Sequence, residues 1–420
     1  MDKRSFLKNV GLMSLAMPLN FVHVHNAVAS VKHLDLAEVA SDEDFWMKVR
    51  GDYDLKPDYI NLENGYYCFM PRQTMEHLIE HMRNVNYEGS YYMRTVQWEN
   101  KKKVANKVAE IVGCTAEEVA ITRNTTESLD LVIGGMHWNA GDEAVMAEQD
   151  YGAMLNHFKF IERRFGTVNK LVSVPNHPKD DEEIVDLYAS AITDKTRLLM
   201  VCHMVNITGQ VLPIRKIADM AHARGVEVMV DGAHAFSHID FNMKDLDCDY
   251  YGTSLHKWLS APLGSGMLYV KKEKIDTVWP LLAEGDLDPN DIGRLNHIGT
   301  HPVHTDLAIL DAIEYQNAIG LGRKEARLKY LQHYWTSQLR DLPRVVVNSP
   351  AEMSRHGGIG NVGIEGIEPA DLAARLMQEY RIFTVAIDRP GVRGLRITPN
   401  VYTTTDELDS LVIAIKDLST

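Results

Sequence analysis

The sequence predicts an α/β fold: a large unit on a mostly parallel sheet, followed by a smaller α+β unit at the C-terminus. Three short apolar runs have strand length, at 143–147, 197–205 and 226–230. Segment 213–224 lies between the last two runs, repeats its apolar residues at helical spacing and stops at Gly225. Because continuous apolar runs are typical of strands buried on both faces, this order predicts β-α-β units.

The remaining pattern of the large unit agrees with that prediction. Apolar residues recur at helical spacing in 104–112 and again in 129–133, and 266–270 reads as a further strand. Two packed units are also the default for 420 residues, because single hydrophobic cores stop growing well below that length.

The pattern of predicted helices and strands changes after about residue 291, and the smaller unit begins there. One long helix over 305–340 leads into an alternation of strands and helices. The predicted elements are strands at 344–348, 361–364, 384–387 and 394–398, and helices at 369–380 and 405–418. The predicted organisation is therefore a leader at 1–29, an N-terminal segment at 30–60, a large domain at 61–295 and a small domain at 296–420.

The N-terminus is typical of an export leader. Lys3-Arg4 precede an apolar stretch over 10–24, and Ala27-Val28-Ala29 has the small-x-small form that signal peptidase accepts, which predicts Ser30 as the new terminus. The pattern resembles a twin-arginine signal with Lys in place of the first Arg, and it predicts a periplasmic or otherwise exported protein. The alternative is an ordinary amphipathic helix on a cytoplasmic protein.

Charge and cysteine content exclude several classes of protein. The net charge of −14 argues against nucleic acid or an anionic membrane as partner. No second long apolar run follows the leader, so no membrane span is expected in the mature chain. The four cysteines form no C-x-x-C pair, and His77 and His81, four apart on a predicted helix, have no third ligand in view, so we expect no metal site and a solvated face.

A carboxylate ends one of the buried strands. Val230-Asp231-Gly232-Ala233-His234 passes from apolar strand to small residues, and ligands of open α/β sheets bind at the carboxyl ends of strands. Asp231 there could keep a ring nitrogen protonated. Taken alone, a solvated aspartate at a strand end is the simpler interpretation.

A lysine in apolar surroundings follows. Lys257 stands between Ser254-Leu255-His256 and Trp258-Leu259, so we expect its neighbourhood to be buried, although a single lysine is usually solvated. Burial lowers the pKa of a lysine amine and makes it nucleophilic. Upstream, Asn124-Thr125-Thr126 leads into the predicted helix over 129–136, and hydroxyls with free N–H groups at a helix start can hold a phosphate. A plain N-cap is the alternative.

Together these features resemble the class V aminotransferase family of fold-type I pyridoxal-5′-phosphate (PLP) enzymes. The order is phosphate cradle, D-G-A-H-A at Asp231 and S-x-H-K-W-L at Ser254, and the resemblance covers residues 60–415. It implies a seven-stranded, mostly parallel large domain, a homodimer with shared sites, and a small amino-acid substrate. In such enzymes a protein carboxylate pairs with the pyridinium nitrogen of PLP, the electron sink.

The resemblance implies a role for each matching residue around the cofactor. Lys257 would form the Schiff base and Asp231 would pair with the ring nitrogen. Tyr151 would stack on the ring, with a core tyrosine as the alternative, while Asn206 and His234 would lie near the ring hydroxyl.

The resemblance also implies how phosphate and substrate are held. Thr125, Thr126, Ser254 and His256 match phosphate ligands, and Gly299-Thr300 resembles the loop that reaches the phosphate of the neighbouring subunit. In a separate segment, Leu395-Arg396-Ile397-Thr398 resembles the part of the family that binds carboxylates, so Arg396 would grip the substrate α-carboxylate in a bidentate fork. The alternative for Arg396 is a structural ion pair.

The reaction remains open among several outcomes. The loop 386–393 lacks the cysteine that desulfurases of the family carry there, which disfavours persulfide transfer. Segments 61–67 and 89–92 resemble the isopenicillin N epimerase-like branch, and one of Tyr66, Tyr67, Tyr91 and Tyr92 could supply a second base, with Tyr66 placed against the substrate. Transamination, a C–S lyase reaction and, outside catalysis, an inactive PLP-fold binding protein are the alternatives.

Overall fold

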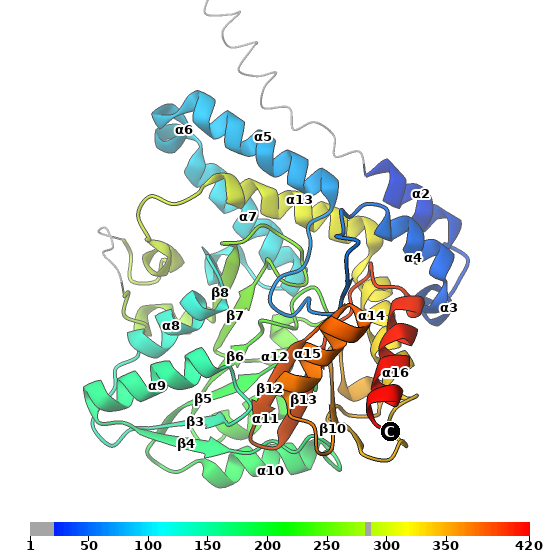
Figure 1. The fold of residues 1–420 in the computed structure, drawn as a ribbon. Coiled ribbons are helices and arrows are strands. Elements are labelled where there is room, and N and C mark those ends of the chain that lie inside the picture. The colour runs from blue at the N-terminus through cyan, green and yellow to red at the C-terminus, as the bar shows by residue number, and fades with distance from the viewer. Residues whose placement is uncertain (1–20, 282–286) are drawn as a thin grey trace, which may run out of the picture.

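The computed structural model describes residues 21–281 and 287–420, and within them it confirms the predicted fold class (Figure 1). The large domain is built on a seven-stranded sheet of order β2-β8-β7-β6-β5-β3-β4. Only β8 runs antiparallel to its neighbours, β2 and β7; the other pairs are parallel. The strands are β2 (Val119–Thr122), β3 (Glu143–Ala147), β4 (Val168–Val172), β5 (Thr196–Cys202), β6 (Glu227–Asp231), β7 (Tyr250–Ser254) and β8 (Gly266–Val270).

Alternation along the central strands places apolar side chains on both faces of this sheet. In β5, Leu199 and Val201 pack into one hydrophobic core while Leu198 and Met200 pack into the other. The predicted helix at 213–224 is α11 (Ile214–His222), whose Ile217 belongs to the first of these cores. The other helices around the sheet are α7 (Gln97–Val112), α8 (Thr125–Gly135), α9 (Gly152–Phe165), α10 (Asp181–Ala191) and α12 (Met243–Leu246), with 3₁₀ turns η1 (Ala116–Glu118), η2 (Lys272–Thr277) and η3 (Ile292–Asn296).

The smaller domain is an antiparallel sheet of order β12-β13-β10-β9 covered by helices. The prediction of one helix over 305–340 is wrong, because Gly320 adopts φ 91° and separates two helices. The elements are α13 (His304–Ile319), α14 (Leu321–Thr336), β9 (Val345–Val347), η4 (Met353–Arg355), β10 (Gly360–Ile364), α15 (Pro369–Tyr380), β11 (Ile382–Phe383), β12 (Val385–Arg389), β13 (Val392–Ile397) and α16 (Thr405–Leu418).

Residues 60–95 connect the two domains. β1 (Ile60–Asn61) pairs in parallel with β11, and Glu63 bridges to Thr398, so this segment lies against the C-terminal unit although the chain continues into the large one. α5 (Arg72–Glu88) then packs on α13, followed by α6 (Ser90–Thr95). His77 and His81 do not form a solvated face: both bond to the buried carboxylate of Asp311, at 3.2 and 2.8 Å.

Part of the predicted leader is folded. Residues 1–20 lie outside the described residues, but Val22–Ser30 forms α2, which is followed by α3 (Leu36–Ser41) and α4 (Glu43–Arg50). Phe21, Val24 and Ala27 are buried, and the Phe21 ring meets that of Tyr315 edge-on at 5.2 Å. Among the helices that the structure describes, none has the length and apolar character needed to cross a bilayer.

Candidate active site

Asp231 and Lys257 lie at the same edge of the large sheet. Asp231 is the last residue of β6 and is paired in register with Gly252 of the neighbouring β7, whose end leads directly into the loop that carries Lys257. Because parallel strands end at a common edge, two motifs separated along the chain are brought together there. Asp231 is buried, and its carboxylate acts electrostatically on the Lys257 amine.

The Lys257 amine is held by a short chain of hydrogen bonds. Trp258 Nε1 donates to His234 Nδ1 at 3.2 Å, and His234 Nε2 lies 3.0 Å from Lys257 Nζ. Indole N–H can only donate, so Nδ1 of His234 is an acceptor, and a neutral imidazole must then carry its proton on Nε2. Nε2 therefore donates to Nζ, which requires a lone pair on the lysine: the geometry is that of a neutral amine.

Burial shifts the pKa values of His234 and Lys257 in the direction that favours their neutral forms. Burial, followed by the charge of Lys257, holds the pKa of His234 well below its usual value. Burial also lowers the pKa of Lys257 to about 8, although the Asp231 carboxylate acts in the opposite direction. A buried lysine of this kind is available as a nucleophile and as a proton acceptor near neutral pH.

Asp231 has little hydrogen bonding within the chain. Its Oδ1 accepts from the Ala233 N–H at 3.0 Å, and burial raises the pKa of the carboxyl. Next to it in β5, Cys202 Sγ donates to Asp150 Oδ1 at 3.1 Å, and burial raises the pKa of Asp150 to about 7. A cationic ring nitrogen beside Asp231 would return that carboxyl to its ionised form.

The predicted cradle meets the lysine loop through direct hydrogen bonds. The hydroxyl of Ser254 accepts from the Thr125 N–H at 2.9 Å and lies 2.6 Å from Thr125 Oγ1. α8 begins at Thr125, earlier than the apolar spacing indicates, with Asn124 as its N-cap and Thr126 in the first turn. The start of α8 and residues 254–257 thus form one polar end of the sheet, where helix N–H groups can receive an anion.

Close backbone approach at this end depends on a glycine. A Cβ on Gly266 of β8 would lie 2.6 Å from the Asn124 backbone nitrogen and 2.8 Å from Thr122 Oγ1. No other residue fits between the strand and the cradle without displacing one of them. His256 lies on the same side with Nδ1 3.3 Å from the Ser265 carbonyl, and burial lowers the pKa of His256 to about 4.

Three further predicted residues differ in how they are placed. Asn206 has a buried side-chain oxygen without a hydrogen-bond partner among the described residues, which suits a group on a bound molecule. Tyr151 follows Asp150 at the start of α9, with its side chain half-exposed. Thr300 is exposed, and the described residues give it no contact with the Lys257 centre.

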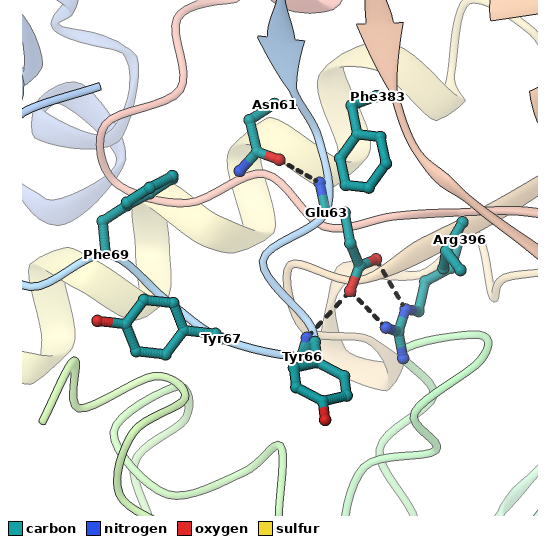
Figure 2. Close-up of a pocket in the computed structure, with 8 residues that line it drawn as sticks. Asn61, Glu63, Tyr66, Tyr67, Phe69, Phe383 and Arg396 are labelled. Atoms are coloured by element: carbon teal, nitrogen blue, oxygen red, sulfur yellow. Dashed lines mark hydrogen bonds and ion pairs between the residues drawn. The ribbon is translucent and has the colours of Figure 1, made fainter. Parts of the chain in front are cut away.

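Arg396 is buried in an ion pair with Glu63 (Figure 2). Nη2 lies 2.5 Å from Glu63 Oε1 and Nε lies 3.2 Å from Oε2, with side-chain exposures of 10% for Arg396 and 8% for Glu63. Glu63 Oε1 also accepts from the Tyr66 N–H at 3.0 Å. A Cβ on Gly65 would lie 2.7 Å from Arg396 Cζ, so glycine is needed for the guanidinium to lie across the backbone.

A cavity of about 360 Å³ opens beside this pair. Small-molecule pockets typically span about 300–1,000 Å³, so it has room for a substrate side chain. Besides the ion pair, its wall consists mainly of aromatic rings contributed by two distant parts of the chain. The lining residues are Asn61, Glu63, Tyr66, Tyr67, Phe69, Phe383, Val385 and Arg396.

The structure adds three residues that the sequence patterns did not single out. Glu63 pairs with Arg396, Trp258 fixes the tautomer of His234, and Lys324 donates to the Trp258 carbonyl and, at 2.9 Å, to Gln316 Oε1. The available signal for Glu63 was that it is the single charged residue in the segment 60–70, two positions before Gly65. Lys324 left no local signal, because its partners come from distant segments.

Comparisons with known proteins agree with this architecture. The sequence matches the family described as Aminotransferase class-V over residues 70–393, about three quarters of the chain. It is 27% identical to isopenicillin N epimerase from Streptomyces clavuligerus, over 89% of this chain and 98% of that protein.

Solved structures show the same fold at lower identity. An apo cysteine desulfurase from Thermococcus onnurineus NA1 superposes with a TM-score of 0.78 at 23% identity, covering 90% of this chain and 98% of that one. A structure of C-DES, which carries glycine covalently linked to its PLP cofactor, superposes with a TM-score of 0.79 at 20% identity, covering 88% and 99%. These likenesses show a fold common to enzymes with different names.

Proposed function

The chain belongs to the class V aminotransferase family, which makes it a PLP-dependent enzyme, and we propose that it moves a proton at the α-carbon of an amino acid, as an epimerase does. The observation that carries the proposal is the Lys257 amine, buried with Asp231 at one sheet edge and 3.0 Å from His234 Nε2, with its pKa lowered to about 8 by burial. The similarity to isopenicillin N epimerase supports the choice of epimerisation within the family.

The residues present fit the cofactor. The cradle of Thr125, Thr126, Ser254 and His256 would hold its phosphate, since N–H and hydroxyl groups converge there and Gly266 lets β8 approach the start of α8 closely. Asp231 would hold the ring nitrogen, while Asn206 and His234 would face the ring hydroxyl and Tyr151 would cover the ring. When bound, PLP withdraws electrons from the bonds at the substrate α-carbon.

The protein groups then decide which bond reacts. Lys257, with a pKa of about 8, is suited to take a proton from the α-carbon and to return it, because a catalytic base works best near the ambient pH. His234 orients the amine through Nε2. Arg396 would bind the α-carboxylate and so place the α-hydrogen toward Lys257.

Epimerisation requires a second base on the opposite face of the α-carbon. Of the four candidate tyrosines, Tyr66 and Tyr67 line the cavity beside Arg396. Tyr91 is exposed on α6, and the hydroxyl of Tyr92 accepts from Asn100 Nδ2 at 3.0 Å. This placement supports Tyr66 or Tyr67 as the group on the second face. Burial raises the pKa of Tyr67, so its hydroxyl is protonated near neutral pH and would act by giving a proton to the α-carbon.

Transamination and a C–S lyase reaction would use the same centre. Transamination would need Lys257 to move the proton onward to the cofactor, and a C–S lyase would expel a sulfur leaving group. Persulfide transfer is disfavoured because residues 386–393 form the hairpin of β12 and β13 without a cysteine. An inactive binding protein would have no need of a desolvated lysine at the sheet edge.

Product analysis in heavy water tests the proposal. The holoenzyme is incubated with a panel of L- and D-amino acids, and α-deuteration and products are measured. Epimerisation predicts deuterated amino acid of inverted configuration. Keto acid, or ammonia with pyruvate, would instead identify transamination or elimination, and deuteration without inversion would exclude a second base.

We also propose a homodimer and export. The exposed Gly299-Thr300 loop supports a role at the phosphate of a partner subunit. In mixed dimers of one wild-type chain and one Thr300→Ala chain, we expect weaker cofactor binding only at the site that the loop of the variant chain reaches.

The leader-like N-terminus supports export. Because Ala27 is buried in α2, cleavage before Ser30 would remove part of a packed helix, and N-terminal sequencing of the secreted protein will show whether it occurs.

A further inference from the structure

The ion pair between Glu63 and Arg396 occupies the position at which the substrate carboxylate is expected. Both oxygens of Glu63 contact the guanidinium, and both side chains are about nine-tenths buried. Arg396 Nη1 points to the Asn206 carbonyl at 3.4 Å, and Gly65 closes the other side. A substrate carboxylate can therefore take the Nε–Nη2 fork of Arg396 only by replacing Glu63 there.

Displacement changes the charge balance of a buried site. Glu63 and Arg396 together are neutral, but adding one substrate carboxylate leaves an excess negative charge. Removing one partner from a buried ion pair is strongly unfavourable, because the remaining charge has lost its hydration without compensation. An amino acid with a neutral side chain would bear this cost, and one with an acidic side chain would add to it.

A substrate that brings a second positive charge restores the balance. The α-carboxylate then pairs with Arg396 while a cation on the side chain pairs with Glu63. Glu63 then turns away from the guanidinium but remains in the cavity wall, because the Tyr66 N–H can continue to hold Oε1. One ion pair is exchanged for two, and no charge is left unpaired.

The cavity beside Glu63 is lined as a cation site would be. Tyr66, Tyr67, Phe69 and Phe383 line it together with the ion pair, and the rings of Tyr67 and Phe69 stand edge to face at 6.5 Å (Figure 2). Aromatic faces attract ammonium and guanidinium groups, and the effect is strongest where water is excluded. Aromatic rings alone would also accept an apolar side chain, but only a cation can pair with the carboxylate of Glu63.

We propose that the substrate is a basic α-amino acid, whose side-chain ammonium or guanidinium enters the aromatic cavity and pairs with Glu63 while its carboxylate takes over Arg396. This inference rests on the proposed function, since it assumes that an amino acid is bound through Arg396. It makes Glu63 the residue that determines specificity.

Matched ligands test the proposal on the holoenzyme. L-lysine and L-norleucine differ only in the terminal ammonium, and each is titrated while the shift of the visible cofactor band reports binding. We expect an apparent Kd about tenfold lower for L-lysine, and no saturable shift with L-glutamate at the same concentrations. Equal affinities, or tighter binding of L-norleucine or L-glutamate, would overturn the proposal.

Glu63→Gln separates charge from shape. Glutamine can still accept from the Tyr66 N–H, so the variant should fold and bind the cofactor, with a lower melting temperature because Arg396 loses its charged partner. The preference for L-lysine should fall to less than about threefold, chiefly because L-norleucine binds more tightly. Glu379→Gln, which removes an exposed carboxylate paired with Arg375, serves as control and should keep the wild-type ratio.

The two levels of the proposal fail differently. If L-norleucine shifts the band and exchanges its α-hydrogen as readily as L-lysine, the proposed function stands and the charge assignment falls. If Glu63→Gln folds normally and leaves the ligand ratio unchanged, Glu63 does not determine specificity. If no amino acid shifts the band, the proposed function itself fails, and this inference fails with it.

Discussion

The Lys257 centre and the Glu63–Arg396 pocket handle buried charge in opposite ways. Around Lys257, burial drives the groups toward neutrality: the pKa of the lysine falls to about 8, and His234 serves as a neutral donor. Around Arg396, two full charges are retained and neutralise each other across 2.5 Å. The first arrangement leaves a reactive lone pair, whereas the second leaves a charge pattern that a ligand must match.

Different segments of the chain build the reactive centre and the pocket. The reactive centre is built from two compact motifs at the ends of neighbouring strands, 231–234 and 254–258. The pocket is assembled from β1 and the loop after it, the β11–β12 region and β13. The two regions are built from different segments and can be changed by separate substitutions, while the charges of Arg396 and Glu63 still act on the Lys257 amine.

Removing the reactive amine should have the largest effect. Lys257→Ala should lower α-hydrogen exchange by about 10³-fold or more, since it removes both the covalent anchor and the base. Exchange into heavy water, followed by mass spectrometry, measures the loss. Lys272→Ala, at an exposed lysine paired with Glu117, is the matched control, and comparable loss in both variants would contradict a special role for Lys257.

Neutralising the strand-end carboxylate should have the next largest effect. Asp231→Asn keeps the shape but removes the charge that stabilises a cationic ring, and we expect the turnover number to fall about 10²-fold. The cofactor band should also move, because it reports protonation of the ring. Wild-type turnover with an unshifted band would show that Asp231 does not face the ring nitrogen.

The protonation of Lys257 should be visible in cofactor capture by the apo-protein. The neutral amine is the reactive form, so the capture rate should rise with pH, by about tenfold per unit below the pKa of about 8, and level off above it. Stopped-flow absorbance at constant ionic strength measures this profile. A rate that continues to rise toward pH 10 would indicate an amine with the ordinary lysine pKa.

Freeing the tautomer of His234 should have the smallest effect. Trp258→Phe removes the donor to Nδ1, so Nε2 no longer has to carry the proton toward Lys257. We expect capture to slow about two- to tenfold, the range for one hydrogen bond, with the pH midpoint displaced upward. An unchanged midpoint in a stable variant would show that Trp258 only fills space, since it is fully buried.

The sequence predicted the reactive centre better than the pocket. The order of β-α-β units, the strand-end Asp231 and the apolar surroundings of Lys257 are local patterns, and the structure has the parallel sheet and the two residues at one edge. Glu63 was not singled out, because its partner Arg396 lies 333 positions away and only folding brings them together. Spacing alone likewise did not reveal that Asp311 receives His77 and His81, or that Gly320 divides the long helix.

Borohydride reduction of the holoenzyme, followed by peptide mapping, shows directly whether Lys257 carries the cofactor, because reduction fixes the cofactor to the lysine that holds it. Lys324 provides an internal comparison: it is also buried, and burial lowers its pKa to about 8 as well, but it is bonded to Trp258 and Gln316 rather than placed beside His234 and Asp231. We expect the phosphopyridoxyl group on Lys257 alone. Its recovery on Lys324, or on no lysine at all, would contradict this expectation.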